Sequence, residues 1–248
     1  MSNFTTWKSS EFKNYPFLTA EEFGEVCHHL DRKYCQAFLG PVRQQWRLSV
    51  LTALDTTFAF GADYSTYLQI VRPLTRELEL DDGGLSEQLG GFSFDNQQAE
   101  SWLAGDQGMI DLEDADEMSQ HAVIRQSRAV ESPSVTYEVH LHPTYRAPCL
   151  WFSLSGLPVD EPLLDVETVF RRLVPDEFKA RLRNQGPIAA ISADHHPITG
   201  VPTFFIHPCL LGEAMSNFDC SKEDYLMVWL GLVGGCVGLW VPREMASL

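Results

Sequence analysis

Apolar side chains near the N-terminus recur at the spacing of one helix face. Thr19 and Glu22 stand just before them with the T-x-x-E spacing of a capping box, in which each side chain satisfies a free backbone N–H at the helix start. Gly40-Pro41 cannot continue a helix. The pattern therefore predicts a helix over residues 20–39. Its apolar positions are Phe23, Val26, Leu30, Tyr34 and Phe38.

Further along the chain, apolar and polar residues alternate, which is the period of a half-buried strand. Residues 46–50 form one such strand, and residues 64–71 are expected to pair with it as a hairpin, with Gly61 and Asp63 in the turn. Further strands are predicted at 135–141, 149–154, 188–192 and 203–206, and further helices at 166–173, 176–183 and 222–232, the last capped by Ser221. This order predicts an α+β domain with an antiparallel sheet and helices packed on one side or at one end.

One long stretch breaks this pattern and carries most of the charge. Between Glu77 and Ile124 there are 13 acidic residues and no Lys or Arg, while the whole 248-residue chain has a formal charge of −16. We therefore expect a single domain over 1–248 with an acidic, flexible insertion at 76–133, either a solvated loop or a docking segment. Nucleic acid and anionic membranes are poor partners for such a chain, because a phosphate-binding surface needs clustered cations.

The six cysteines show no regular spacing and no C-x-x-C pair, which argues against a disulfide framework and a structural zinc site. Residues 1–16 are polar and aromatic, and they lack the basic start and apolar run of a secretory signal. We therefore expect a cytoplasmic protein with free thiols and with no metal or other cofactor.

One cysteine stands in a context that suits catalysis. Cys209 directly follows His207-Pro208 at the end of an apolar extended run, so its sulfur is expected at an exposed strand exit. Exposed, polar surroundings favour the thiolate, which is the reactive form of cysteine. From these three residues alone, a small side chain packed at a strand end is an equally good interpretation.

Three blocks of sequence favour the catalytic interpretation, because they occur in order and resemble one known family. They are Y-E-V-H-L-H-P-T-Y-R-A-P-C-L-W-F at residues 137–152, H-P-x-x-G-x-P-x-F-F-x-H-P-C at 196–209, and Y-L-x-x-W-L-x-x-V-G-x-x-V-G-L-x-x-P at 225–242. Together they resemble the family of autophagy-related protein ten, a ubiquitin-like-conjugating enzyme of autophagy. The sister family of autophagy-related protein three shares His-Pro-Cys, but its tail differs.

The resemblance implies a ubiquitin-conjugating-enzyme-like core and a two-step reaction. An activating enzyme, autophagy-related protein seven, would pass the modifier, autophagy-related protein twelve, to Cys209 as a thioester. A lysine of the target, autophagy-related protein five, would then take it. Tyr145 matches a tyrosine that the family uses near the cysteine. The chain departs from the family at Leu210-Leu211-Gly212, where a polar residue and a threonine are usual, which leaves the geometry of this loop open.

His207 is the third candidate site residue, beside Cys209 and Tyr145. It lies next to the position where ordinary ubiquitin-conjugating enzymes place an asparagine that stabilises the oxyanion. On a strand, the two-residue step from His207 to Cys209 would put both side chains on one face. A structural ring that shapes the turn is the alternative role for His207, and turn packing is the alternative for Tyr145.

Other interpretations stay open. A cysteine hydrolase would use Cys209 with a histidine base, and a catalytically silent binding module would bury the sulfur. Residues 225–241 are uncharged and about long enough to span a membrane, but their glycines favour a buried helix that runs into an extended exit. Four histidines could converge with Cys209 on zinc, although no pair has a common ligand spacing: His140, His142, His195 and His196.

Overall fold

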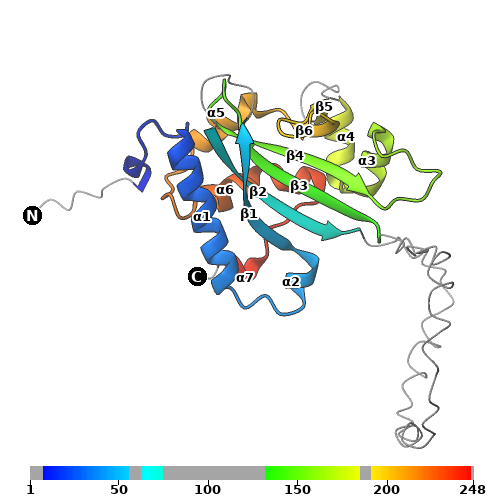
Figure 1. The fold of residues 1–248 in the computed structure, drawn as a ribbon, viewed down its shortest axis with the longest axis horizontal. Helices are drawn as coiled ribbons and strands as arrows, with labels where there is room; N and C mark the ends of the chain where they lie inside the picture. The colour runs from blue at the N-terminus through cyan, green and yellow to red at the C-terminus, as the bar shows by residue number, and fades with distance from the viewer. Residues whose placement is uncertain (1–7, 56–62, 75–131, 185–190, 247–248) are drawn as a thin grey trace, which may run out of the picture. The chain divides into compact units, whose positions relative to one another are not determined.

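The centre of the protein is an antiparallel sheet with strand order β1-β2-β3-β4-β6-β5 (Figure 1). The structure is a computed structural model that describes residues 8–55, 63–74, 132–184 and 191–246. The strands are β1 (Arg47–Asp55), β2 (Asp63–Pro73), β3 (Ser134–Leu141), β4 (Pro148–Ser155), β5 (Ile191–His195) and β6 (Pro202–Ile206). This architecture confirms the predicted α+β class.

The alternation of side chains along the strands gives the sheet one buried, apolar face. In β3, Val135, Tyr137 and Val139 are buried, and Tyr137 and Val139 pair with Ile70 and Leu68 of β2. Because neighbouring side chains of a strand point to opposite faces, the residues between them lie on the other side of the sheet. Glu138 and His140 of β3 therefore belong to this second face.

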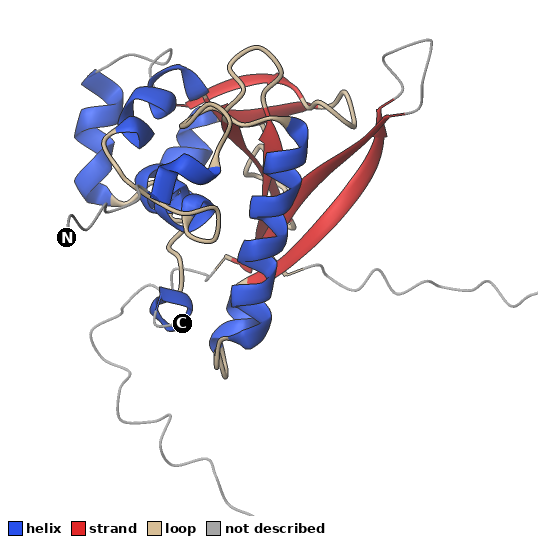
Figure 2. Cartoon of the chain, turned by 90° about the vertical axis from the view of Figure 1, so that its left-hand side faces the viewer, coloured by secondary structure: helices blue, strands red, loops and turns tan. Residues whose placement is uncertain are grey.

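Helix α1 (Ala20–Gln36) packs against β1 and β2, and helix α6 (Tyr225–Val233) packs against α1. The predicted capping box at the start of α1 is present, with Thr19 accepting from the Glu22 N–H and the Glu22 carboxylate accepting from the Thr19 N–H. In Figure 2 the helices gather on one side of the strands. The other helices are η1 (Lys8–Glu11), α2 (Val42–Gln45), α3 (Val166–Arg172), α4 (Asp176–Asn184), η3 (Pro208–Leu210), α5 (Leu211–Ser216), η4 (Gly234–Val237) and α7 (Arg243–Ala246).

Several predicted boundaries are wrong. Helix α1 ends at Gln36 rather than at residue 39, because Ala37 turns to extended backbone and leaves Phe38 93% exposed. Asp63 is the first residue of β2, paired with Asp55, and not part of the turn. The fifth predicted strand segment, 188–192, begins outside the described residues, and the strand described there runs on to His195 (Ile191–His195).

The predicted cap of the last helix is also wrong. Helix α6 begins at Tyr225, so its N-cap position is Asp224 and not Ser221. The Ser221 hydroxyl instead donates to the Asp224 carboxylate at 2.9 Å. The side chain of Ser221 therefore stabilises the residue that precedes the helix rather than the helix itself.

The glycine-rich tail packs into the core, as its composition predicts. A side chain at Gly234 would meet the Leu239 carbonyl oxygen at 2.3 Å, and Gly238 has a φ of +70°. The Tyr137 hydroxyl donates to the Val237 carbonyl at 2.6 Å, which ties this exit to β3. Among the described residues, no helix is both long and apolar enough to cross a membrane.

The acidic insertion connects β2 to β3. The Leu74 N–H donates to the Pro133 carbonyl at 2.8 Å, and Pro73 pairs with Ser134, so the two ends of the insertion lie side by side. Residues 75–131 lie outside the described part of the chain, and the expectation that 76–133 is flexible stays a prediction.

Candidate functional site

Cys209 is exposed, as the sequence predicts for a nucleophile. The contrast with other cysteines is clear, because burial raises the pKa of the Cys149 thiol to about 12 and that of Cys236 to about 11. Burial raises the pKa of Cys27 as well. Those three side chains are held as thiols inside the protein, and Cys35 is the other cysteine that is exposed.

The segment around Cys209 is a helical turn and not the end of a strand. Strand β6 ends at Ile206, and His207 is the N-cap of the short helix η3, with Pro208 at its first position. The His207 Nδ1 accepts the Cys209 backbone N–H at 3.2 Å. The prediction that His207 and Cys209 share one face of a strand is therefore wrong. A hydrogen bond within the turn brings the His207 ring beside Cys209 instead.

The same His-Pro construction occurs at two further places. The His142 Nδ1 accepts from the N–H groups of Thr144 and Tyr145, at 3.2 and 3.3 Å. The His196 Nδ1 accepts from the N–H groups of Ile198 and Thr199, both at 3.3 Å. Proline follows each histidine and has no N–H to donate. The histidine Nδ1 therefore accepts hydrogen bonds from the backbone N–H groups of the residues after the proline. In each turn the acceptor role of Nδ1 leaves the ring proton on Nε2.

Tyr145 lies between two of these histidines. Its ring packs against His142 at a centroid distance of 4.8 Å and against His207 at 5.3 Å. The structure thus brings together all three predicted site residues, because His207 also touches the Cys209 backbone. Tyr145 and Cys209 line a common cleft of about 370 Å³.

The opposite wall of this cleft comes from the N-terminal segment. Pro16 and Phe17 line it, and this segment is held in place from several sides. The Leu18 N–H donates to the Arg146 carbonyl at 2.8 Å, and the Tyr15 hydroxyl donates to the Met215 carbonyl at 2.7 Å. The wall is therefore anchored both to the β3–β4 turn and to the helix that follows Cys209.

The departure from the family at Gly212 has a physical reason in this wall. A Cβ at Gly212 would lie 2.9 Å from Cε1 of Phe17, which is closer than real side chains approach. Glycine therefore lets the Phe17 ring pack against α5 beside the cysteine. The loop geometry that the sequence left open is a continuous turn from η3 into α5.

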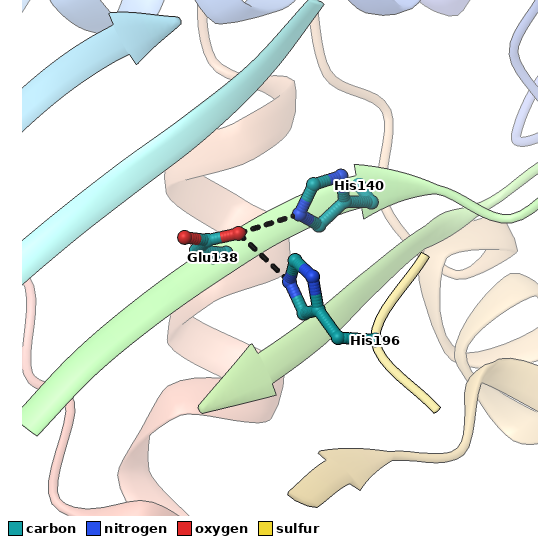
Figure 3. Close-up of side chains that lie close together, drawn as sticks. All are labelled: Glu138, His140 and His196. Atoms are coloured by element: carbon teal, nitrogen blue, oxygen red, sulfur yellow. Dashed lines mark hydrogen bonds and ion pairs between the residues drawn. The ribbon is translucent and has the colours of Figure 1, made fainter. Parts of the chain in front are cut away.

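A second cluster of polar side chains, Glu138, His140 and His196, lies close together on the second face of the sheet (Figure 3). His140 Nε2 and His196 Nε2 both donate to Glu138 Oε2 at 2.9 Å, and Gln69 Nε2 donates to Glu138 Oε1 at 2.9 Å. Burial alone would raise the pKa of Glu138, but these hydrogen bonds outweigh it and hold the pKa far below its usual range. Burial lowers the pKa of His140 against the opposing effect of Glu138.

This cluster is built as a hydrogen-bond network rather than as a set of metal ligands. The ligand atoms of Glu138, His140 and His196 lie within 4.8 Å of one another, which is close enough to consider a metal. However, a histidine ligates through a lone pair, and the proton of His196 is on Nε2 because Nδ1 accepts two backbone N–H groups. The absence of a metal from the protein stays a prediction.

The structure does not assemble the zinc set that the sequence raised. His140 and His196 meet, but within the described chain the cluster includes neither Cys209 nor the other two histidines. His142 lies against Tyr145, and His195 is exposed beside Asp194. His140 and His196 therefore lie together, while His142 and His195 lie elsewhere, and the four histidines do not form one site.

Sequence reasoning missed two residues of the cleft, Phe17 and Glu213. Phe17 lies between residues 1–16, considered only as a possible leader, and the helix predicted from residue 20, so no prediction included it. Glu213 stands four residues after Cys209, a spacing that matters only once a helix is known to follow the cysteine. The remaining lining residues are Ala147, Pro208 and Ser216.

Comparisons with known proteins show the family of the chain. Residues 22–244 match the family described as "Autophagocytosis associated protein, active-site domain". The chain is 60% identical to the ubiquitin-like-conjugating enzyme ATG10 of Gibberella zeae over 235 residues, which are 94% of this chain and 98% of that protein. It is 33% identical to the ATG10 enzyme of Homo sapiens over 127 residues, 48% of this chain and 56% of that protein. The ATG10 enzyme of Arabidopsis thaliana is 29% identical over 149 residues, 55% and 63% of the two chains.

Proposed function

The chain belongs to the ATG10 family of ubiquitin-like-conjugating enzymes of autophagy, and from this premise we propose that Cys209 carries the modifier as a thioester. The observation that carries the proposal is the exposure of Cys209 at the edge of a cleft that Tyr145 also lines. A carrier cysteine must be reached by two proteins in turn, first the activating enzyme and then the acceptor. An exposed sulfur beside an open cleft meets that requirement.

The first step is a thioester exchange. The Cys209 thiolate attacks the carbonyl carbon of the thioester that joins the modifier to the activating enzyme. A new C–S bond forms to Cys209, the old one breaks, and the thiolate of the activating enzyme leaves. Exposure favours this step, because the thiolate is the nucleophile and water stabilises its charge.

The second step transfers the modifier to a lysine of the target. The lysine nitrogen attacks the Cys209 thioester, and negative charge develops on the carbonyl oxygen. Donors placed in advance near that oxygen lower the barrier. The Cys209 N–H is already engaged with His207 Nδ1, so His207 offers its Nε2–H as a donor. We assign His207 to oxyanion stabilisation rather than to general-base catalysis.

Tyr145 is proposed to hold this arrangement together. Its ring contacts both His207 and His142, and it is 38% exposed at the cleft. A flat ring in this place restricts the orientation of His207 and offers an apolar wall to an incoming side chain. Its proposed role is therefore the positioning of His207.

The family premise also suggests the partners. We propose autophagy-related protein twelve as the modifier, autophagy-related protein five as the target and autophagy-related protein seven as the activating enzyme. The cytoplasm is the proposed location.

A silent binding module is less well supported, because that interpretation called for a buried Cys209. A hydrolase is also less well supported, because Nδ1 of His207 is occupied by a backbone N–H.

A non-reducing gel tests the carrier role. The protein is incubated with the activating enzyme, ATP and the modifier, and a band of higher mass that dithiothreitol removes is expected. Cys209→Ala should abolish the band, and Cys209→Ser should give a band that resists thiol. Absence of the band with the unaltered protein, while the activating enzyme itself is charged, would contradict the proposal.

A further inference from the structure

A carboxylate shares the cleft of Cys209. Residues 208–216 run as one continuous turn from η3 into α5, so Glu213 lies one helical turn beyond Cys209 on the same side. Both side chains line the cleft of about 370 Å³. Side chains at the C-terminal end of α5 stabilise this segment, because the Glu213 carbonyl accepts from Ser216 Oγ at 2.7 Å and from Asn217 Nδ2 at 3.1 Å.

Within the described chain, no hydrogen bond or ion pair engages the carboxylate of Glu213. Several other acidic side chains among the described residues are engaged by cations or hydrogen-bond donors. Arg172 Nε donates to Glu161 at 2.9 Å, and two histidines and Gln69 donate to Glu138. The lining of the cleft contains no other charged side chain among the described residues. The cleft therefore presents one unneutralised negative charge beside the nucleophile.

We propose that Glu213 receives the amine of the acceptor lysine, an inference that rests on the carrier role of Cys209. A lysine has a pKa of about 10.4 in water, so it arrives as an ammonium ion and is attracted to a carboxylate. The Phe17 and Tyr145 rings give apolar walls along which the aliphatic stem of lysine packs. Anionic groups are repelled from the same cleft.

The protons of the transfer balance as follows. The bound ammonium loses one proton to water, and the neutral amine attacks the thioester carbonyl carbon. As the C–N bond forms, the nitrogen becomes strongly acidic, and Glu213 accepts its second proton. The C–S bond then breaks with its electron pair on Cys209 Sγ, and the proton held by Glu213 passes to the sulfur, so that Glu213 is again a carboxylate. The products are the isopeptide amide and the free thiol.

A discharge experiment separates the acceptor step from the loading step. The protein is charged with the modifier, the activating enzyme is stopped by chelating magnesium, and either free lysine or hydroxylamine is added. Hydroxylamine is uncharged at neutral pH, so the carboxylate of Glu213 does not attract it. Loss of the thioester band over time gives the rate for each nucleophile in the unaltered protein and in Glu213→Gln.

Glu213→Gln is expected to form the thioester normally and to react with lysine roughly 3- to 5-fold more slowly, the upper range for one exposed charge pair. Its reaction with hydroxylamine should change less than about twofold, within the spread expected for a surface substitution. The loss should shrink as the lysine concentration rises, and Glu213→Asp should recover part of it. Glu223→Gln removes an exposed carboxylate that does not line the cleft and should behave like the unaltered protein.

Two results would overturn the assignment of Glu213. One is a lysine rate in Glu213→Gln equal to that of Glu223→Gln, and the other is an equal loss of rate with both nucleophiles. Failure of the unaltered protein to form any thioester is a different result, which would overturn the carrier role itself and the acceptor role that depends on it.

Discussion

The turns at His196-Pro197 and His207-Pro208 have the same local structure and different surroundings. In both, the histidine Nδ1 accepts backbone N–H groups of the residues after the proline. His196 is 7% exposed, and its Nε2–H is used by Glu138. His207 is half-buried, and its neighbours are the Tyr145 ring and the Cys209 backbone.

The difference shows that the local motif and the function are separable. The His-Pro pair shapes a turn in each case and leaves the Nε2–H free to be donated. A buried carboxylate takes that N–H at His196, which makes the residue part of the scaffold. At His207 the ring lies beside the backbone of the proposed carrier cysteine, where its Nε2–H is proposed to serve the reaction.

The largest expected effect comes from His207→Ala. Removal of one oxyanion donor costs about 100-fold in rate in well-studied enzymes, so discharge of the Cys209 thioester to lysine should slow by a factor of this order. His207→Asn should recover part of the rate, because an amide can cap the turn and still donate an N–H. A single-turnover discharge assay measures both variants. Equal rates in His207→Ala and the unaltered protein would contradict the donor role.

His196→Ala should show the opposite profile. It leaves the Glu138 carboxylate short of one buried donor and removes the turn cap, which should lower the free energy of unfolding by roughly 2–3 kcal/mol. Urea unfolding followed by tryptophan fluorescence measures this loss. Thioester formation, assayed where the variant is folded, should match the unaltered protein. A loss of thioester formation without a loss of stability would contradict the proposed difference between the two turns.

The Glu138 network should make stability depend on pH. His140 has a lowered pKa in the folded state, so stability should begin to fall as the pH drops below about 6.5, where the unfolded chain gains a proton first. Glu138 also has a lowered pKa, so its contribution is present above about 4.3 and is lost as the pH falls further.

Glu138→Gln tests this dependence. At neutral pH the variant should be less stable by about 2 kcal/mol, because a charged hydrogen-bond acceptor is replaced by a neutral one. The gap between the two proteins should close as the pH falls towards the range in which Glu138 is protonated. Thermal unfolding across pH measures the gap, and a gap that is constant from pH 7 to acid would show that the charge of Glu138 is not involved.

The smallest effect is expected for Tyr145→Phe. The ring contacts with His142 and His207 do not need the hydroxyl, so discharge should slow by less than about threefold, within the usual range for substitutions that keep packing. Tyr145→Ala removes the ring and should slow discharge by roughly tenfold, since a displaced donor loses much of its effect. If Tyr145→Phe is as slow as Tyr145→Ala, the hydroxyl takes part in the chemistry and the positioning role is wrong.

Much of the fold could be predicted from local patterns, and the site only in part. The capping box at Thr19 and the alternation in β3 depend on neighbouring residues, so the sequence shows them directly. The meeting of Glu138 with His196, 58 residues later, has no local signal. Nor does the contact between Phe17 and Gly212, although the segment at residues 210–212 departs from the family pattern and so marked the place. Helix α5 is too short for a periodic pattern, and Glu213 was missed for that reason.

The most direct test of the carrier role is the intact mass of the charged protein. Cys35→Ser is the matched control, because Cys35 is the other exposed thiol. The unaltered protein and Cys35→Ser should each gain the mass of one modifier less one water, and hydroxylamine should remove that gain. Cys209→Ala should gain nothing. A gain that persists in Cys209→Ala and disappears in Cys35→Ser would contradict the assignment of Cys209.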